Sequence, residues 1–294
     1  MATLSVVMPS YCQAPFLAKT IESVLAQSLQ PDEYIILDDA STDKSAEIID
    51  SYARLYPTIR FIRNPVNRGA GYTGDRLFKE AVSDYIISLG PDDIILPGFF
   101  ENVMKMANQY PEAGIIFGKM GVVDMNGEPI NIEEVKCWQT PLYASPEVFI
   151  REYLNTELPN HQLGLTMAWK RSALVEINYF CEELGSFLDT FAARAIALKY
   201  GACYVPEVFA CWRYDPNSFS NKNSSNASYY IDQLELAEKL MRSPDFKDRF
   251  PEEYILNWSH RYRNMLLERY SSSAMHNLNL YKNKISKDVS SLKL

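Results

Sequence analysis

The first 97 residues alternate short apolar runs with helix-spaced segments, and this alternation constrains the fold more than any other feature. The runs at 4–8, 33–37, 59–62 and 85–89 are typical of buried strands. The segments 14–27, 41–52 and 71–82 have helical spacing, the second with short polar caps at Ser41-Thr42-Asp43. This order predicts βαβ units and a mostly parallel sheet flanked by helices, with ligands bound beyond the carboxyl ends of the strands.

Beyond Pro97 the pattern loosens, and the expected elements are shorter. The stretch 131–160 is expected to be rich in loops, and the Ser/Asn-rich stretch 217–228 is expected to be a loop. From Tyr229 the pattern is again helical, with breaks at Pro244 and Pro251. The other expectations are helices at 99–108 and 189–200, strands at 114–117, 166–169, 202–205 and 208–213, and a hairpin turn at 125–128.

Charge and cysteine content narrow the class of protein. The net charge of −8 argues against nucleic acid as a partner. The five cysteines are scattered without a Cys-x-x-Cys pair, which indicates reduced thiols rather than a disulfide framework or a zinc site. The sequence shows no secretory signal and no stretch of 18 apolar residues. We therefore expect a cytoplasmic protein.

An acidic pair, Asp92-Asp93, directly follows the fourth expected strand. Adjacent carboxylates after a buried strand are costly unless a positive charge lies between them. Hard oxygen ligands of this kind suit Mg²⁺ or Mn²⁺ carried with a diphosphate. A helix cap or a polar turn before Ile94 explains the same pair equally well. The pair alone therefore leaves both interpretations open.

A second acidic pair, Asp38-Asp39, follows the second expected strand, at the same edge of the sheet. One of its carboxylates could accept the imide N–H of a uracil or thymine base, and Tyr11 could stack on that base. Arg68, in a Gly-rich stretch, could neutralise a diphosphate. That stretch lacks the pattern of a P-loop, and the first strand is not followed by Gly-x-Gly-x-x-Gly, which disfavours a dinucleotide fold. Together these clusters favour nucleotide binding.

Several motifs now match a known family in the right order. The segments 5–11, 21–28, 38–43, 67–69 and 85–93 resemble the opening of inverting family 2 glycosyltransferases, and the match covers about residues 3–215. The resemblance implies a GT-A fold, with a nucleotide-binding half at about 1–97 and an acceptor half at 98–225. Residues 1–225 would be the catalytic domain, and 226–294 a helical C-terminal extension.

The resemblance also implies roles for individual residues. Pro9 and Tyr11 match the segment that contacts the base, and Asp39, with Asp38 beside it, matches the carboxylate that reads the base. Asp93 would be the ligand of Mg²⁺ or Mn²⁺, and Asp92 would lie near the ribose. Asp189 would be the general base, where the residues alone also allow a helix N-cap. The implied activity is that of a metal-dependent inverting transferase, similar to the hexosyltransferases.

This chain departs from the family pattern at four places. Gly90 replaces the first acid of the usual Asp-x-Asp-Asp, and Leu188 replaces the Glu before the base. Asp215 stands where a His is common, and Gly74-Asp75 stands where the family often has Arg-Asn. A non-catalytic homologue that binds nucleotide sugars or glycans therefore stays an alternative. A nucleotidyltransferase is disfavoured, because 10–15 holds neither Gly nor a basic residue.

The implied donor is a nucleotide sugar, with UDP or dTDP favoured, and the implied acceptor is a glycan or a lipid-linked sugar of the bacterial surface. Residues 256–294 contain seven Lys/Arg and two acids, a net charge of +5. Ile255, Trp258, Tyr262 and Leu266, at and just before the start of this basic segment, recur at helical spacing. This pattern predicts a helix that packs on the catalytic domain or on a second subunit in a homo-oligomer. It also suits an interfacial helix at the inner membrane face, bound to anionic lipid.

Overall fold

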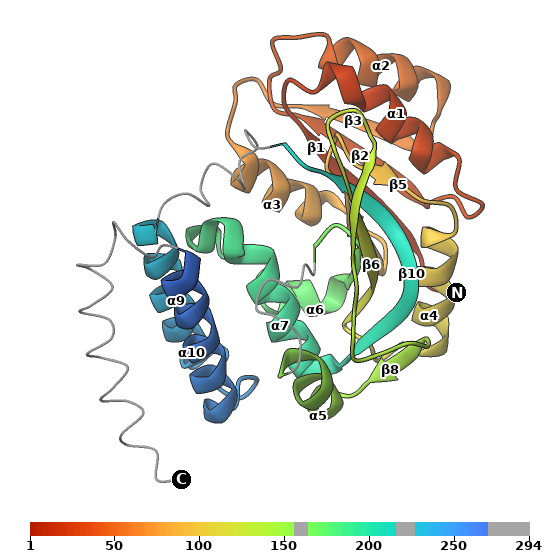
Figure 1. Ribbon diagram of the computed structural model, residues 1–294. Helices are drawn as coiled ribbons and strands as arrows, with labels where there is room; N and C mark the ends of the chain where they lie inside the picture. The colour runs from red at the N-terminus through yellow and green to blue at the C-terminus, as the bar shows by residue number, and fades with distance from the viewer. Residues whose placement is uncertain (156–163, 216–226, 270–294) are drawn as a thin grey trace. The chain divides into compact units, whose positions relative to one another are not determined.

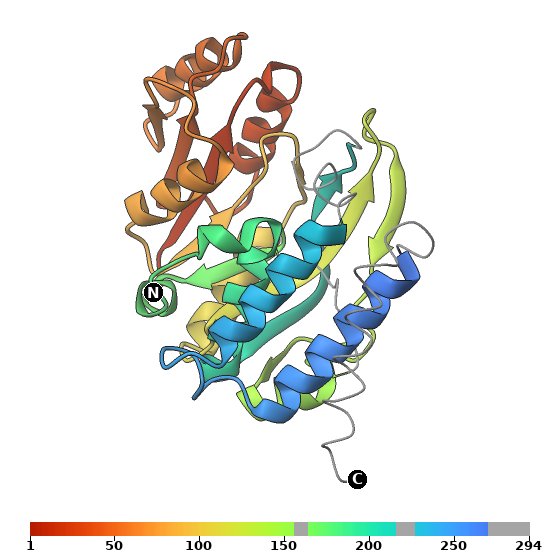
Figure 2. The same ribbon diagram turned by 90° about the vertical axis from the view of Figure 1, so that its left-hand side faces the viewer.

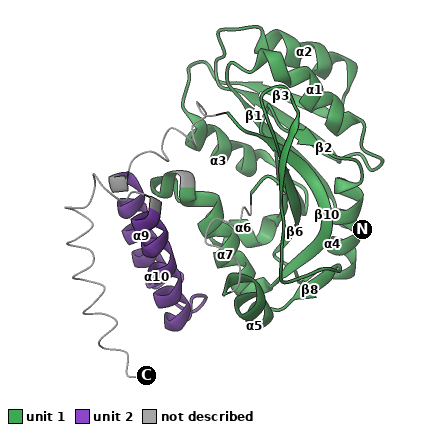
Figure 3. Cartoon of the chain, viewed as in Figure 1, with its two compact units in different colours: residues 1–216 green, residues 217–294 purple. Residues whose placement is uncertain are grey.

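The chain divides into two compact units, Met1–Pro216 and Asn217–Leu294 (Figure 3). The computed structural model describes residues 1–155, 164–215 and 227–269. Unit 1 holds every strand found in those ranges and most of the helices, and unit 2 holds two helices. Within the same ranges, no helix combines the length and the apolar character that a membrane crossing requires.

Unit 1 alternates strands and helices from its first residues, as the sequence predicts. The elements of its first part are β1 (Leu4–Ser10), α1 (Ala14–Leu25), β2 (Glu33–Asp38), α2 (Ser45–Leu55), β3 (Ile59–Arg63), α3 (Ala70–Glu80), β4 (Tyr85–Ser88), β5 (Ile94–Ile95) and α4 (Phe99–Gln109). Its second part contains β6 (Ile115–Val123), β7 (Pro129–Glu133), β8 (Leu142–Ala144), α5 (Pro146–Val148), the π-helix η1 (Phe149–Leu154), β9 (Met167–Lys170), α6 (Arg171–Glu176), the 3₁₀-helix η2 (Glu182–Phe187), α7 (Leu188–Tyr200) and β10 (Ala202–Arg213).

The ten strands of the described chain form one sheet. Its main path has the order β3-β2-β1-β4-β9-β6-β10-β5, with β7 paired to β6 and β8 paired to β10. The strands β3, β2, β1 and β4 are all parallel, and β10 is parallel to β6, whereas β9 is antiparallel to both of its neighbours. The expected mostly parallel sheet is confirmed for the first half of the unit.

Helices cover both faces of this sheet. The helices α1, α2 and α4 lie on one side, and α3, α6 and α7 lie on the other (Figures 1 and 2). This arrangement follows from right-handed crossovers, because the chain steps outward from β1 to β3 and then reverses direction to reach β4. The register pairs Ser10 with Asp38 and Val7 with Ser88, so the carboxyl ends of β1, β2 and β4 meet at one edge.

The segment 131–160 has more structure than the sequence suggests, as far as Asn155, where the described part ends. It contains β8, α5 and η1, and the expectation of loops was wrong for these residues. The reason is an aromatic cluster, in which Trp138 stacks on Tyr153 with ring centroids 5.5 Å apart and Phe149 stacks on Tyr153 at 4.8 Å. Phe117 of β6 and Tyr204 of β10 complete the cluster. Burial of these large rings overrides the weak local pattern.

Two other expectations need correction or fall outside the described residues. The strands expected at 202–205 and 208–213 form one strand, β10, because its register with β6 shifts on both sides of Val208 and so absorbs Pro206. The loop expected at 217–228 lies mostly outside the described residues, and its last two residues begin a helix.

The described part of unit 2 contains α9 (Ala227–Met241) and α10 (Glu252–Arg269), which confirms the helices expected around Pro244 and Pro251. Glu238 of α9 forms an ion pair with Arg263 at 2.7 Å and accepts a hydrogen bond from Ser259. Arg242 pairs with Glu252 at 2.8 Å. These polar contacts join the two helices to each other.

Candidate active site

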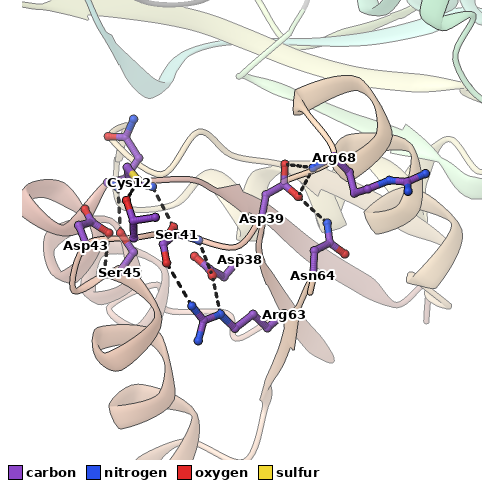
Figure 4. Close-up of polar contacts among 11 residues, drawn as sticks. Cys12, Asp38, Asp39, Ser41, Asp43, Ser45, Arg63, Asn64 and Arg68 are labelled. Atoms are coloured by element: carbon purple, nitrogen blue, oxygen red, sulfur yellow. Dashed lines mark hydrogen bonds and ion pairs between the residues drawn. The ribbon is translucent and has the colours of Figure 1, made fainter. Parts of the chain in front are cut away.

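Asp39 directly follows β2 and holds two loops together at the carboxyl edge of the sheet (Figure 4). Its Oδ1 accepts a hydrogen bond from Asn64 Nδ2 at 2.6 Å and one from the Arg68 N–H at 2.9 Å. Its Oδ2 accepts the N–H of Gly69 at 2.8 Å. Burial raises the pKa of Asp39, but these hydrogen bonds outweigh burial and bring the pKa below its usual value. The carboxylate is therefore ionised at neutral pH, with acceptor capacity for one more donor.

The neighbours of Asp39 play different parts. Asp38 is fully buried, where its Oδ2 accepts the N–H of Ser41 at 3.0 Å and pairs with Arg63 Nε at 3.2 Å. The Arg68 side chain is exposed, and its guanidinium lies 4.5 Å from the ring centroid of Tyr72. The structure therefore gives Asp38 structural partners, while Arg68 presents its charge to the surface.

The motif that follows Asp39 bonds the start of α1 as well as that of α2, where Asp43 Oδ1 accepts the N–H of Ser45 at 3.0 Å. Ser41 Oγ accepts the N–H of Cys12 at 2.9 Å, Asp43 Oδ2 accepts that of Ala14 at 3.1 Å, and Ser45 Oγ accepts that of Gln13 at 2.9 Å. All three N–H groups lie at the start of α1, which has no acidic residue in its first turn. Caps of this type satisfy the free donors of a helix start. The sequence-based expectation that Ser41 starts a helix was wrong, because α2 begins only at Ser45.

Asp43→Ala is expected to lower the free energy of unfolding by about 1 kcal/mol, because it removes a helix cap and a charge at the helix start. Urea denaturation measures this loss. Asp50→Ala is the control, because Asp50 forms an exposed i,i+4 pair with Arg54 within α2. That pair contributes at most about 0.5 kcal/mol. Equal losses in the two variants would show that Asp43 acts only as a surface charge.

The acidic pair Asp92-Asp93 lies in the loop between β4 and β5, and Asp93 is 5% exposed. Its Oδ2 accepts the N–H of Gly90 at 2.9 Å, and Thr20 of α1 donates its hydroxyl to the carbonyls of Pro91 and Asp93. Burial, followed by the charge of Asp92, raises the pKa of Asp93 to about 7. Burial also raises the pKa of Asp92. The next element is a strand paired with β10, so the pair is not a helix cap.

Gly90 makes this loop conformation possible. A Cβ on Gly90 would lie 2.4 Å from Asp93 Oδ2 and 3.2 Å from Asp92 Oδ1. The first of these distances is far below van der Waals contact, so any side chain at 90 would displace the Asp93 carboxylate. The glycine that departs from the family pattern is therefore part of how the acidic pair packs.

Arg213, the last residue of β10, is a site residue that the sequence reasoning passed over. Its Nε donates to the carbonyl of Asp92 at 3.0 Å, and its backbone N–H approaches Asp93 Oδ1 at 3.4 Å. Its guanidinium carbon lies 4.9 Å from the ring centroid of Phe16. Arg213 lies two residues before Asp215, the position where the family often has a His, but its partners are distant along the chain.

Asp189 lies in the first turn of α7, one residue after the helix begins, and the N-cap position belongs to Phe187. Its Oδ1 accepts the N–H of Thr190 at 2.6 Å and the hydroxyl of the same residue at 3.2 Å. A Cβ on Gly164 would lie 3.3 Å from its Oδ2. Burial raises the pKa of Asp189, which makes its carboxylate a stronger base than an exposed aspartate. The N-cap interpretation of this residue was therefore wrong.

The structure places the expected residues at four elements. They are Pro9 and Tyr11 at β1, Asp38, Asp39 and Arg68 at β2, Asp92 and Asp93 after β4, and Asp189 in α7. Tyr11, 46% exposed, follows β1, and β1 lies between β2 and β4. Tyr11 therefore leaves the sheet between the two acidic pairs. Among the described residues, no three His, Cys, Asp or Glu side chains lie close enough to hold a metal ion.

Relatives of known sequence match parts of the chain. The chain is 30% identical over 212 residues to the uncharacterized glycosyltransferase MJ1057 of Methanocaldococcus jannaschii, which is 71% of this chain and 70% of that protein. It is 35% identical over 104 residues to YibD of Escherichia coli, covering 35% of this chain and 30% of YibD. It is 33% identical over 108 residues to the minor teichoic acid biosynthesis protein GgaB of Bacillus subtilis, covering 36% of this chain and 12% of GgaB.

Solved structures share the fold over nearly the whole chain. S. aureus TarS 1–349 in complex with UDP-GlcNAc has a TM-score of 0.72 at 15% identity, over 93% of this chain and 77% of that TarS chain. The mannosyltransferase PcManGT of Pyrobaculum calidifontis, in complex with GDP-Man and Mn²⁺, has a TM-score of 0.60 at 17% identity, over 97% of this chain and 80% of that protein. These likenesses bear out the GT-A fold. The sequence profile of glycosyl transferase family 2 matches residues 5–168, more than half of the chain, and the chain belongs to that family.

Proposed function

We propose that this protein is a metal-dependent inverting glycosyltransferase that moves a sugar from a nucleotide-sugar donor to an acceptor hydroxyl. The observation that carries the proposal is the edge formed by β2, β1 and β4, where Asp39 and the acidic pair lie on either side of exposed Tyr11. Binding beyond the carboxyl ends of parallel strands is the rule for such sheets. The fold of neighbours that bind UDP-GlcNAc or GDP-Man supports the same conclusion.

The nucleotide would bind at β1 and β2. Tyr11 has the exposed ring needed to stack on a base, and Pro9 lies two residues before it at the end of β1. Asp39 is ionised and can accept the imide N–H of uracil or thymine, the bases of the UDP and dTDP donors that the family resemblance favours. The exposed guanidinium of Arg68 would approach the diphosphate, and Asp38 would support Asp39 from inside the sheet.

The acidic pair suits a divalent cation. Asp93 is buried and Asp92 is half-buried, and burial raises the pKa of both carboxyl groups. Hard oxygen ligands of this kind fit Mg²⁺ or Mn²⁺. Asp93 would be the ligand, with Asp92 near the ribose and with the remaining ligands supplied by the diphosphate and water. A bound cation would supply positive charge to the leaving diphosphate.

Asp189 would be the general base. An inverting transfer needs one group to take the proton of the acceptor hydroxyl as that oxygen attacks the anomeric carbon. The raised pKa of Asp189 suits this role. Both hydrogen bonds from Thr190 fall on Oδ1, so Oδ2 would accept the proton. No covalent intermediate is needed.

We further propose that residues 1–225 act as the catalytic domain, with a glycan or lipid-linked acceptor from bacterial surface polysaccharide synthesis. The alignment with GgaB supports that setting. Residues 226–294 would be a helical extension whose apolar residues pack on protein rather than on lipid. Within this unit Glu238 of α9 contacts both Arg263 and Ser259 of α10, so the two helices are joined to each other.

Thermal-shift measurements against UDP-, dTDP- and GDP-sugars, with and without Mn²⁺, test the proposal. The true donor should stabilise the protein by about 2.7 kcal/mol at 100 times its Kd, and more strongly with Mn²⁺ than without it. Liposomes with anionic lipid should not sediment the protein at low salt. A protein that responds to no donor, with or without Mn²⁺, would overturn the assignment.

A further inference from the structure

Arg213 joins three segments that are distant along the chain. Its Nε donates to the carbonyl of Asp92 in the acidic loop at 3.0 Å. Its Nη1 donates to the carbonyls of Asp124 and Met125, both at 3.0 Å, in the turn between β6 and β7. Its guanidinium also lies over the ring of Phe16 in α1. One side chain thus contacts the acidic loop, a hairpin turn and a helix.

The cost of burying this side chain indicates that its position matters. Arg213 is 5% exposed, and a buried guanidinium is strongly destabilising unless its N–H groups are hydrogen-bonded. Here they donate to backbone carbonyls, so the contact fixes the path of the backbone and does not depend on any partner side chain. The planar fork of an arginine reaches two segments at once, which the single ammonium group of a lysine cannot do.

The hairpin turn has a well-defined conformation of its own, so its contact with Arg213 can fix the position of the Arg213 side chain. The N–H groups of Asn126 and Glu128 both donate to Asp124 Oδ1 at 2.8 Å. Gly127 has a φ of +92°, a conformation that other residues rarely adopt. A Cβ on Gly127 would lie 3.8 Å from Arg213 Nη1, so the turn packs directly on the guanidinium.

We propose that Arg213 is a positioning residue that holds the acidic loop against the hairpin turn 124–127, so that this turn forms part of the wall of the donor site. The inference rests on the proposed function, because it assigns the acidic loop to the diphosphate and the cation. Arg213 acts on that loop through the carbonyl of Asp92. The turn follows β6 and therefore comes from the second half of the unit.

The test compares Arg213→Met with Arg171→Met, using UDP with Mn²⁺ and uridine as probes in isothermal titration calorimetry. Arg171 also donates its Nε to a backbone carbonyl, that of Ala81 at 2.9 Å, but it lies beyond the opposite end of β4. We expect Arg213→Met to weaken UDP binding in the presence of Mn²⁺ by about tenfold or more, and to leave uridine binding unchanged. Arg171→Met should leave both affinities unchanged.

Two further variants separate positioning from other roles. Gly127→Ala strains the turn without touching the acidic loop, and it should also weaken UDP with Mn²⁺ selectively. If Gly127→Ala binds like the parent while Arg213→Met does not, Arg213 contacts the diphosphate directly and the positioning role is wrong. Arg213→Lys keeps the charge but loses the fork, so parental affinity in that variant would overturn the proposal.

The remaining outcomes are equally decisive. Equal weakening of uridine and of UDP by Arg213→Met would indicate a general structural role and would overturn the inference. If Arg213→Met does not fold, the Arg213→Lys and Gly127→Ala measurements decide the matter alone. A parent protein that binds neither UDP nor dTDP in the presence of Mn²⁺ refutes the proposed function instead, and that result is visible before any variant is made.

Discussion

Asp189→Asn is expected to lower donor turnover by about 10²- to 10⁴-fold, the range that a general base contributes. The amide keeps the shape of the side chain and can still accept the Thr190 hydrogen bonds on its oxygen. It cannot take a proton from an attacking hydroxyl. Donor affinity should stay within about twofold of the parent, because the proposed donor contacts lie at β1, β2 and the acidic loop.

The measurement needs no knowledge of the acceptor. Release of the nucleoside diphosphate can be followed with water as the attacking hydroxyl, and calorimetry gives the donor affinity. Asp75→Asn is the control, because Asp75 forms a surface pair with Lys79 in α3. A parental rate in Asp189→Asn would show that another group is the base, and loss of donor binding would show that Asp189 belongs to the donor site.

Asp93→Asn is expected to remove both the response to Mn²⁺ and part of the pH dependence of stability. The pKa of Asp93 is raised from 3.8 to about 7 in the folded protein, while the unfolded chain keeps the ordinary value. Between these two values the folded protein holds a proton that the unfolded chain has lost. The associated stability is therefore present below about pH 4 and is lost as the pH rises through 7.

In metal-free buffer the melting temperature of the parent should fall between about pH 5 and pH 8, and it should fall less in Asp93→Asn. Added Mn²⁺ with UDP should stabilise the parent more at the higher pH, because a cation and a proton compete for the same carboxylate. Asp75→Asn is again the control, because Asp75 forms its pair with Lys79 in α3. A parental response to Mn²⁺ in Asp93→Asn would exclude Asp93 as the ligand.

The first half of the fold could be predicted because its strands are buried on both faces. Such strands appear as continuous apolar runs, and 33–37 is one of them, with Tyr34 to Leu37 at most 1% exposed. The aromatic cluster around Trp138 could not be predicted in the same way. Its rings come from 117, 138, 149, 153 and 204, and no local period connects residues so far apart.

The candidate site shows the same difference between residues placed by local pattern and residues placed by distant contacts. Asp39 and the acidic pair follow strands, so topology alone brings them to one edge. Asp43 and Arg213 were given no such role, because what they do depends on distant partners. Asp43 caps a helix that precedes it in the chain, and Arg213 binds a carbonyl 121 residues away. Their residue types carry no sign of these partners.

The loop around Gly90 has a consequence for how the family motif is read in this chain. At the position where the family resemblance implies an acid, this chain has no room even for a methyl group, because Asp93 Oδ2 fills that space and accepts the Gly90 N–H. An aspartate introduced by Gly90→Asp would expel the Asp93 carboxylate from its place in the loop. A change toward the family pattern would therefore displace the proposed metal ligand instead of adding a second one.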